Sequence, residues 1–217
     1  MSIAPRIEHT DLRAAATPED VERLCRESAE NGFHGVCVNP IFVSLARRTL
    51  AVGRVVTVVG FPLGATPSEI KAAEARRAVG NAADEIDMVI TIGAAKSGDY
   101  AAVTADVRAV RDAVPNATLK AILETGLFDA DEIAKAALAA IDGGADFVKT
   151  STGFGPRGAT VEDIRILRHA VGDRARIKAS GGIRTLAEAL ALIEAGADRI
   201  GTSNGVAIAR EARLTTP

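Results

Sequence analysis

The chain has 217 residues, of which 47% are hydrophobic and 25% charged, an ordinary composition for a globular protein with a full hydrophobic core. Its formal charge of -2 comes from 26 basic and 28 acidic residues spread along the sequence, which argues against a nucleic-acid partner. The apolar runs are too short to cross a membrane and the first twenty residues lack the pattern of a secretion signal, so we expect no membrane partner and a cytoplasmic location.

Short β-branched or apolar runs alternate with longer amphipathic, alanine-rich stretches along the whole chain. This alternation is typical of repeated βα units. The runs predict eight strands, at 6–9, 35–38, 55–60, 85–90, 119–123, 147–151, 176–180 and 199–202.

Helix start signals lie between these runs, at Thr17-Pro18, at 66–69, at Asp129 and at Thr160. Eight strands that are each followed by a helix predict a single (β/α)8 parallel barrel, a TIM barrel, that forms one catalytic domain over residues 1–217. An open doubly wound sheet is the alternative, but no Gly-x-Gly-x-x-Gly follows the first strand. Residues 211–217 lack strong periodicity and are expected to form a mobile tail.

Four predicted strands carry a charged residue between apolar neighbours: Asp87, Lys120, Lys149 and Lys178. Because side chains alternate between the two faces of a strand, apolar neighbours that face the helices direct these charges toward the barrel axis. The chain has 20 arginines but only six lysines, and three of the six lie in predicted strands. Lysine is therefore concentrated where the interior cavity is expected.

An inward pair of lysines beside a carboxylate suits imine chemistry. A lysine attacks a carbonyl only as the neutral amine, and a second ammonium nearby, together with partial desolvation, lowers its pKa. Asp87 would balance the charge of the second lysine and move protons. The alternative is a buried ion network without catalytic function, and Lys120 fits it best because Glu85 or Glu124 could neutralise this lysine.

Three glycine-rich loops follow the last three predicted strands, at 150–155, 180–184 and 201–205. Glycine allows backbone N–H groups to approach an anion closely, and a helix that begins near Asn204 would direct its N-terminus to the same place. A phosphate monoester is the expected ligand. Each loop alone could be an ordinary tight connection.

Four motifs stand out along the chain: VGFPLG at 59–64, KTSTGF at 149–154, KASGGIRT at 178–185 and GTS at 201–203. Through these motifs the chain resembles the deoxyribose-phosphate aldolase family over nearly its whole length.

The resemblance implies a reversible cleavage of 2-deoxy-D-ribose 5-phosphate to D-glyceraldehyde 3-phosphate and acetaldehyde, in deoxynucleoside breakdown. It implies that Lys149 forms the Schiff base, that Lys178 is the ammonium that lowers its pKa, and that Asp87 belongs to the proton relay. No cofactor is implied. The residues implied to hold the phosphate are Gly153, Gly181, Gly182, Ser203 and Asn204.

Three positions depart from the family pattern: Glu8 stands where aspartate is usual, Thr91 where asparagine is common, and Asn204 where a second serine is often found. Asn204 makes a change in phosphate affinity the expected consequence. Cys37 is expected to be a buried, packed thiol.

The alternatives to this aldolase are another Schiff-base lyase, a phosphosugar isomerase, and a barrel that binds sugar phosphates as a sensor without turnover. The three histidines have no metal-ligand spacing, which disfavours a metal-dependent aldolase. The alanine-rich helix faces favour a homodimer.

Overall fold

Eight parallel strands close into a barrel in the computed structural model, which describes residues 2–215. Each strand pairs with its neighbours in the sequence, and β8 pairs with β1. The predicted barrel is confirmed, and the doubly wound alternative is wrong. The strands are β1 (Ile7–Asp11), β2 (Gly35–Val38), β3 (Arg54–Val59), β4 (Glu85–Val89), β5 (Thr118–Ile122), β6 (Phe147–Lys149), β7 (Arg176–Ser180) and β8 (Arg199–Thr202).

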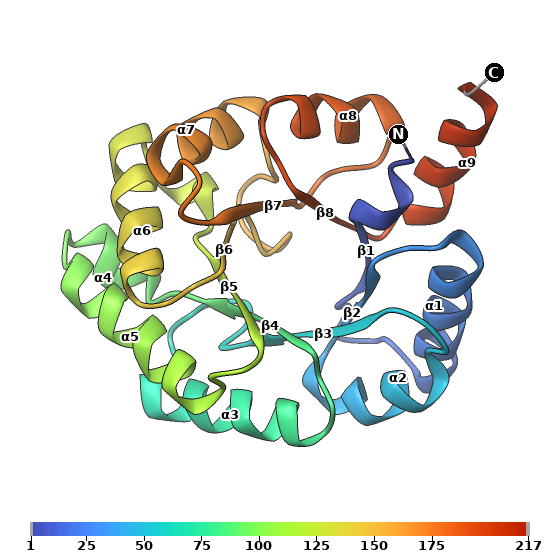
Figure 1. Ribbon diagram of the computed structural model, residues 1–217. Coiled ribbons are helices and arrows are strands. Elements are labelled where there is room, and N and C mark those ends of the chain that lie inside the picture. Colours follow the sequence, from blue (N-terminus) through green and yellow to red (C-terminus); the bar gives the residue numbers. More distant parts are fainter. Residues whose placement is uncertain (1, 216–217) are drawn as a thin grey trace.

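Helices surround the barrel (Figure 1). The α-helices are α1 (Pro18–Asn31), α2 (Val43–Thr49), α3 (Ser68–Gly80), α4 (Ile92–Lys96), α5 (Tyr100–Ala113), α6 (Ala130–Asp142), α7 (Val161–Val171), α8 (Leu186–Glu194) and α9 (Gly205–Thr215). Three 3-10 turns are η1 (Ala4–Arg6), η2 (Pro40–Phe42) and η3 (Thr125–Leu127).

Several helices begin at a side chain that accepts a hydrogen bond from the first turn. Thr17, Asp129 and Thr160 form capping boxes with the residues three positions later, as their sequence context predicts. Thr185 caps α8 in the same way. Helix α3 begins at Ser68 after Pro67 without a side-chain cap.

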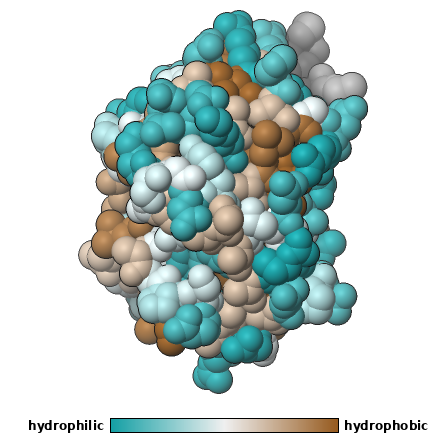
Figure 2. Space-filling model, turned by 90° about the vertical axis from the view of Figure 1, so that its left-hand side faces the viewer, coloured by the Kyte–Doolittle hydropathy of each residue, from teal (hydrophilic) through white to brown (hydrophobic). Residues whose placement is uncertain are grey.

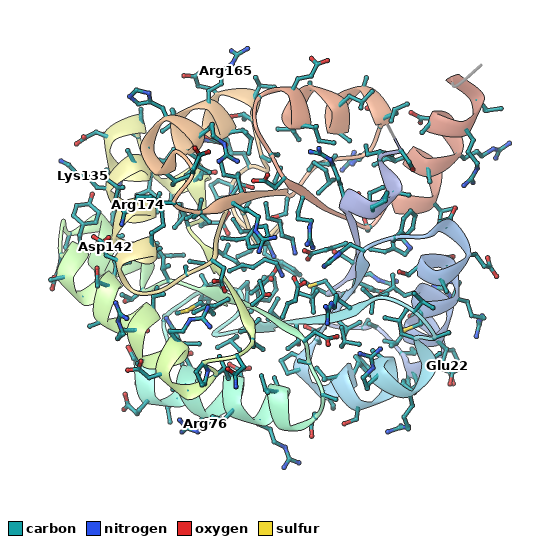
Figure 3. All side chains as sticks on the ribbon, viewed as in Figure 1. Glu22, Arg76, Lys135, Asp142, Arg165 and Arg174 are labelled. Carbon is teal, nitrogen blue, oxygen red and sulfur yellow. The ribbon has the colours of Figure 1, made fainter. Side chains whose placement is uncertain are left out.

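The main hydrophobic core lies between the barrel and the helices. Strand residues such as Val36, Ile86 and Ile177 are buried there, and they pack against apolar side chains of the helices. Charged side chains such as those of Arg76 and Arg165 project outward from the helices (Figure 3). On the side of α4 to α6, the surface mixes hydrophilic and hydrophobic residues (Figure 2). The strand residues that face the barrel axis do not belong to this core, so they are available to form a binding or catalytic site.

The C-terminal end of the chain differs from the expected tail. Residues 211–215 continue helix α9, whereas residues 216 and 217 lie outside the described part of the chain. None of the helices between residues 2 and 215 has the length and hydrophobicity that crossing a bilayer requires.

Candidate active site

The four charged strand residues point into the barrel and are almost completely buried. The exposed fractions are 0% for Asp87 and Lys120, 3% for Lys149 and 1% for Lys178. Lys149 pairs with Lys178 across β6 and β7, whereas Lys120 pairs with Phe147, two residues before Lys149. Lys120 therefore lies one layer deeper in the barrel.

Asp87 brings the three lysines together. Its Oδ2 accepts hydrogen bonds from Lys149 Nζ at 2.7 Å and from Lys178 Nζ at 2.6 Å, and its Oδ1 accepts one from Lys120 Nζ at 2.8 Å. Two lysine nitrogens that share one carboxylate oxygen are within strong electrostatic reach of each other.

Two glutamates complete the buried cluster. Glu8 accepts a hydrogen bond from Lys178 and also lies 3.5 Å from Lys120 Nζ and 3.4 Å from a guanidinium nitrogen of Arg199. Glu85 lies 2.6 Å from Lys120 Nζ, so the expected neutralising partner of this lysine is Glu85. Glu124, the other candidate, instead contacts Thr152.

Burial lowers the pKa of Lys149, and the charge of Lys178 lowers it further against the opposing effect of Asp87. Burial also acts to lower the pKa of Lys178, but Asp87 and Glu8 outweigh burial and raise it. Burial acts to raise the pKa of Asp87, but the three lysines hold it well below its ordinary value. Lys149 is thus the lysine of this pair that is disposed to lose its proton.

The charges of the lysines, the arginine and the carboxylates in this cluster balance when Lys149 is a free amine. The other members are the carboxylates Glu8, Glu85 and Asp87 and the cations Lys120, Lys178 and Arg199. A buried cluster with equal numbers of positive and negative charges costs less to desolvate than one with an excess charge. Charge balance therefore also favours the neutral form of Lys149.

One group in the described part of the chain has donor atoms close enough together to hold a metal ion. It consists of Glu8, His34 and Glu85, whose donor atoms lie within 4.8 Å of one another. His34 Nε2 lies 2.7 Å from Glu85, and the carboxylates already contact Lys120, Lys178 and Arg199. The carboxylate oxygens that a metal ion would need are therefore already in contact with these cations and with His34.

Cys37 is buried beside the cluster, where it packs against Leu12, Val56 and Val58. Burial raises the pKa of the Cys37 thiol to about 11, so the thiol is neutral at physiological pH. This confirms the expectation that Cys37 is a buried, packed thiol.

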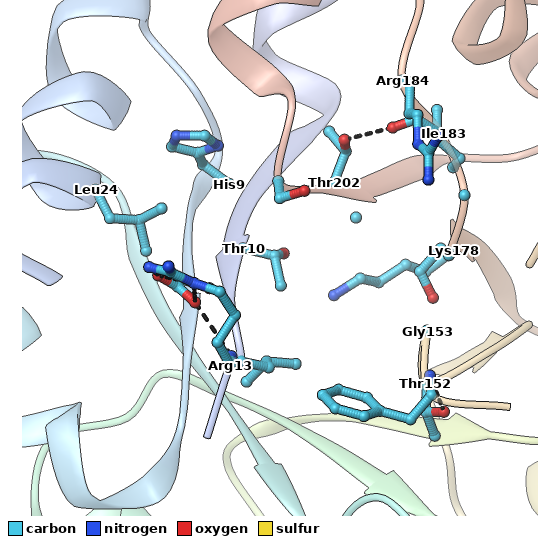
Figure 4. A pocket seen from close by; sticks show the side chains of 18 of the residues that line it. His9, Thr10, Arg13, Leu24, Thr152, Gly153, Lys178, Ile183, Arg184 and Thr202 are labelled. Atoms are coloured by element: carbon cyan, nitrogen blue, oxygen red, sulfur yellow. Dashed lines mark hydrogen bonds and ion pairs between the residues drawn. The ribbon is translucent and has the colours of Figure 1, made fainter. Parts of the chain in front are cut away.

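A cavity of about 610 Å³ opens above Lys149 and Lys178 at the C-terminal ends of the strands (Figure 4). Four of the five residues that were expected to bind phosphate line it: Gly153, Gly181, Gly182 and Ser203. Asn204 does not. It lies beside the cavity, where its side-chain amide donates to the Arg184 carbonyl at 3.5 Å.

The backbone N–H groups of these four lining residues have no hydrogen-bond partner among residues 2–215. Gly153, Gly181 and Gly182 have φ angles of +87°, +88° and +76°, a region that L side chains rarely adopt. Ser203 lies two residues before Gly205, where α9 begins, close to the helix start that was expected near Asn204. Together these donors form a site suited to an anion.

Several lining residues were not predicted. Arg13 and Arg184 lie at the rim (Figure 4), and Arg184 could have been found because it is a cation that follows a Gly-Gly turn. Arg13 pairs with Asp11 and Asp20. Gly201 allows the close approach of Lys178, since a Cβ there would lie 2.9 Å from Lys178 Cε.

The fold and site define a (β/α)8 barrel with a buried polar cluster and a rim of free backbone N–H groups at the C-terminal ends of its strands, the layout of barrel enzymes. The chain belongs to the DeoC/LacD aldolase family, whose model matches residues 4–214.

A deoxyribose-phosphate aldolase of Thermus thermophilus is 54% identical over 210 residues, which are 96% of each chain. A solved structure described as the aldolase QR15 has a TM-score of 0.95 and 41% identity, and it covers 98% of this chain and 96% of its own. The tetrameric deoxyribose phosphate aldolase of Aeropyrum pernix has a TM-score of 0.88 and 33% identity, with 99% and 92% covered.

Proposed function

We propose that the chain reversibly cleaves 2-deoxy-D-ribose 5-phosphate to D-glyceraldehyde 3-phosphate and acetaldehyde, with an imine on Lys149 as the intermediate. The observation that carries this proposal is the shared contact of Lys149 and Lys178 with Asp87 Oδ2 beneath a cavity lined by free backbone N–H groups. The name of the relative from Thermus thermophilus supports the choice of substrate.

The reaction begins when the neutral amine of Lys149 attacks the C1 aldehyde of the open-chain sugar. Loss of water from this adduct gives an iminium ion, which accepts the electron pair of the C2–C3 bond as that bond breaks. The C3 hydroxyl loses its proton to the relay, and D-glyceraldehyde 3-phosphate leaves. The enamine that remains on Lys149 is protonated at C2, and water hydrolyses the iminium ion to acetaldehyde and free lysine.

Asp87 and Lys178 serve these proton transfers. Asp87 Oδ2 lies 2.7 Å from the nitrogen that forms the imine and 2.6 Å from Lys178 Nζ, so a proton can pass between the groups directly or through one water. Lys178 keeps its charge and holds Lys149 in the reactive form. All atoms of the reaction come from the sugar, water and these side chains.

The phosphate is assigned to the N–H groups of Gly153, Gly181, Gly182 and Ser203. A phosphate monoester carries about two negative charges near neutral pH, and backbone donors at loop and helix starts suit such an anion. Arg184 at the rim adds positive charge. The distance between the phosphate site and Lys149 then selects a sugar of fixed length.

The decisive experiment is incubation with acetaldehyde and borohydride, followed by peptide mass mapping. We expect a reduced N-ethyl adduct on Lys149, and we expect Lys149→Leu to lose both the adduct and the cleavage of the sugar phosphate. Lys96→Leu, which removes an exposed lysine, is the control and should retain both. Absence of an adduct on Lys149 would instead support a sensor without turnover.

We also propose that residues 1–217 fold as one domain, that the protein acts in the cytoplasm and that it forms a homodimer. The strands of the barrel extend from Ile7 to Thr202, and the two cysteines are free and buried, as is usual in a reducing compartment. The relative from Aeropyrum pernix is tetrameric. A single cooperative unfolding transition and light scattering at several concentrations test the domain and the dimer.

A further inference from the structure

Glu124 lies two residues after the end of β5, behind the loop that follows Lys149, and it is not among the residues that line the cavity. Only 3% of this residue is exposed. Its Oε1 atom is buried and has no hydrogen-bond partner among the described residues. Because a buried carboxylate oxygen without a partner costs stability, folding alone does not explain a glutamate here.

The backbone of Glu124 is also strained. Its φ and ψ angles are 61° and 59°, in the left-handed region that a residue with a Cβ atom avoids. Ala82 is the only other residue between 2 and 215, apart from glycines, with a positive φ. Backbone strain of this kind often occurs where a side chain must be held for function.

The carboxylate of Glu124 fixes the residues on both sides of Gly153, Thr152 directly and Phe154 through the Thr152 hydroxyl. Its Oε2 accepts a hydrogen bond from Thr152 N at 3.2 Å and another from the Thr152 hydroxyl. The same hydroxyl accepts a hydrogen bond from Phe154 N at 3.0 Å. These bonds satisfy the N–H groups before and after Gly153, and the Gly153 N–H remains free at the cavity.

Gly155 makes this arrangement possible. A Cβ atom at Gly155 would lie 2.6 Å from the carboxylate carbon of Glu124, which is closer than real Cβ contacts. An alanine at this position would therefore displace the carboxylate of Glu124 from its present place. Gly155 itself does not line the cavity, so its substitution tests the contact without touching the substrate.

We propose that Glu124 is a positioning residue for phosphate: through Thr152 it fixes the loop so that the Gly153 N–H faces the phosphate group. This proposal rests on the proposed function for the identity of the substrate. Glu124 does not reach the reacting carbon atoms, so its removal weakens binding of the phosphate end and leaves the chemistry at Lys149 in place.

The test compares 2-deoxyribose 5-phosphate with 2-deoxyribose, which lacks the phosphate. Glu124→Gly removes the carboxylate and relieves the strain, and Gly155→Ala displaces the carboxylate by a separate route. For both variants we expect kcat/KM for the phosphorylated sugar to fall about 10- to 100-fold, mainly through a higher KM. The reason is that the Gly153 N–H is no longer held toward the phosphate, so its hydrogen bond to this charged group is lost. For the unphosphorylated sugar we expect a change of less than about twofold.

Two further variants isolate the cause. Ala82→Gly relieves the other strained residue, and it should change neither substrate's kinetics. Glu124→Gln retains an oxygen that can accept from Thr152, and it should stay within about threefold of the parent protein. An equal loss on both sugars, or a loss in Glu124→Gln as large as in Glu124→Gly, would overturn the proposal.

Binding of inorganic phosphate, measured by calorimetry, separates this proposal from the proposed function. We expect Glu124→Gly and Gly155→Ala to weaken phosphate binding about tenfold or more, whether or not the sugar is cleaved. Weakened phosphate binding in a protein that cleaves neither sugar would contradict only the aldolase assignment. Unchanged phosphate binding in both folded variants, checked by circular dichroism, would contradict the role of Glu124.

Discussion

Lys149 and Lys178 donate to the same oxygen of Asp87, at 2.7 Å and 2.6 Å. The two lysines differ in their other contacts, because Lys178 also donates to Glu8 whereas Asp87 is the carboxylate that Lys149 contacts. The lysine with two carboxylates keeps its proton more strongly than the lysine with one. This asymmetry assigns different chemical roles to two residues of the same type.

The first prediction concerns Lys178→Met. Removal of this positive charge makes the ammonium form of Lys149 more favourable, so the pKa of Lys149 rises. Because the neutral amine is the reactive form, the acidic limb of the kcat/KM profile should move to higher pH, with a loss of at least about 100-fold at pH 7. Steady-state rates between pH 5 and 10 measure this, with Lys96→Met as the control. An unchanged acidic limb would count against the assignment.

Lys120→Met is predicted to affect stability. Lys120 Nζ lies among three buried carboxylates, and its loss leaves them with too few cations. We expect the free energy of unfolding to fall by about 3–5 kcal/mol, the usual effect of breaking a buried ion pair. Urea denaturation measures it, and Lys135→Met at an exposed pair should show no measurable change. Equal stabilities of the two variants would be inconsistent with the contacts of Lys120.

Acid should destabilise the protein through the same carboxylates. Burial opposes ionisation of Asp87 and Glu85, but Lys120 and, for Glu85, also His34 lower their pKa values below those in the unfolded chain. The unfolded chain therefore binds more protons in acid, and the stabilisation is complete above about pH 4 to 5 and is lost as the pH falls further. Urea midpoints from pH 6 to 3 measure this. A midpoint that does not decrease over this range would contradict the low pKa values.

The buried pair of Lys71 and Asp106 lies outside the site and allows a double-mutant cycle. Lys71 Nζ is 2.7 Å from Asp106 and 2.9 Å from the carbonyl of Val89, the last residue of β4. Lys71→Met should cost about 3–5 kcal/mol because it leaves a buried carboxylate unpaired, and Lys71→Met combined with Asp106→Leu should cost less than the sum of the single changes. Additive effects in denaturant unfolding would show that the pair does not couple.

Asn204→Ser restores the residue that is common in the family at this position. Since the Asn204 side chain lies beside the cavity and contacts Arg184, we expect KM for the sugar phosphate to change by less than about twofold. Ser203→Pro, which removes a backbone donor at the cavity, should raise KM much more. A large change in Asn204→Ser would mean that the asparagine contacts the phosphate after all.

The sequence determined the eight strands, the inward direction of Asp87, Lys120, Lys149 and Lys178, and the glycine loops. The reason is that alternation along a strand and the need for positive φ at glycine are local properties. Glycines at 153, 181 and 182 have this conformation in the structure.

Only the tertiary structure decided which of these residues meet, and at what depth. Lys178 and Glu8 are 170 residues apart, and their contact depends on the register in which eight strands close. A shift of two residues preserves every inward direction and changes every partner. The same register decided between the two candidate partners of Lys120: Glu85 contacts this lysine, whereas the carboxylate of Glu124 accepts a hydrogen bond from Thr152.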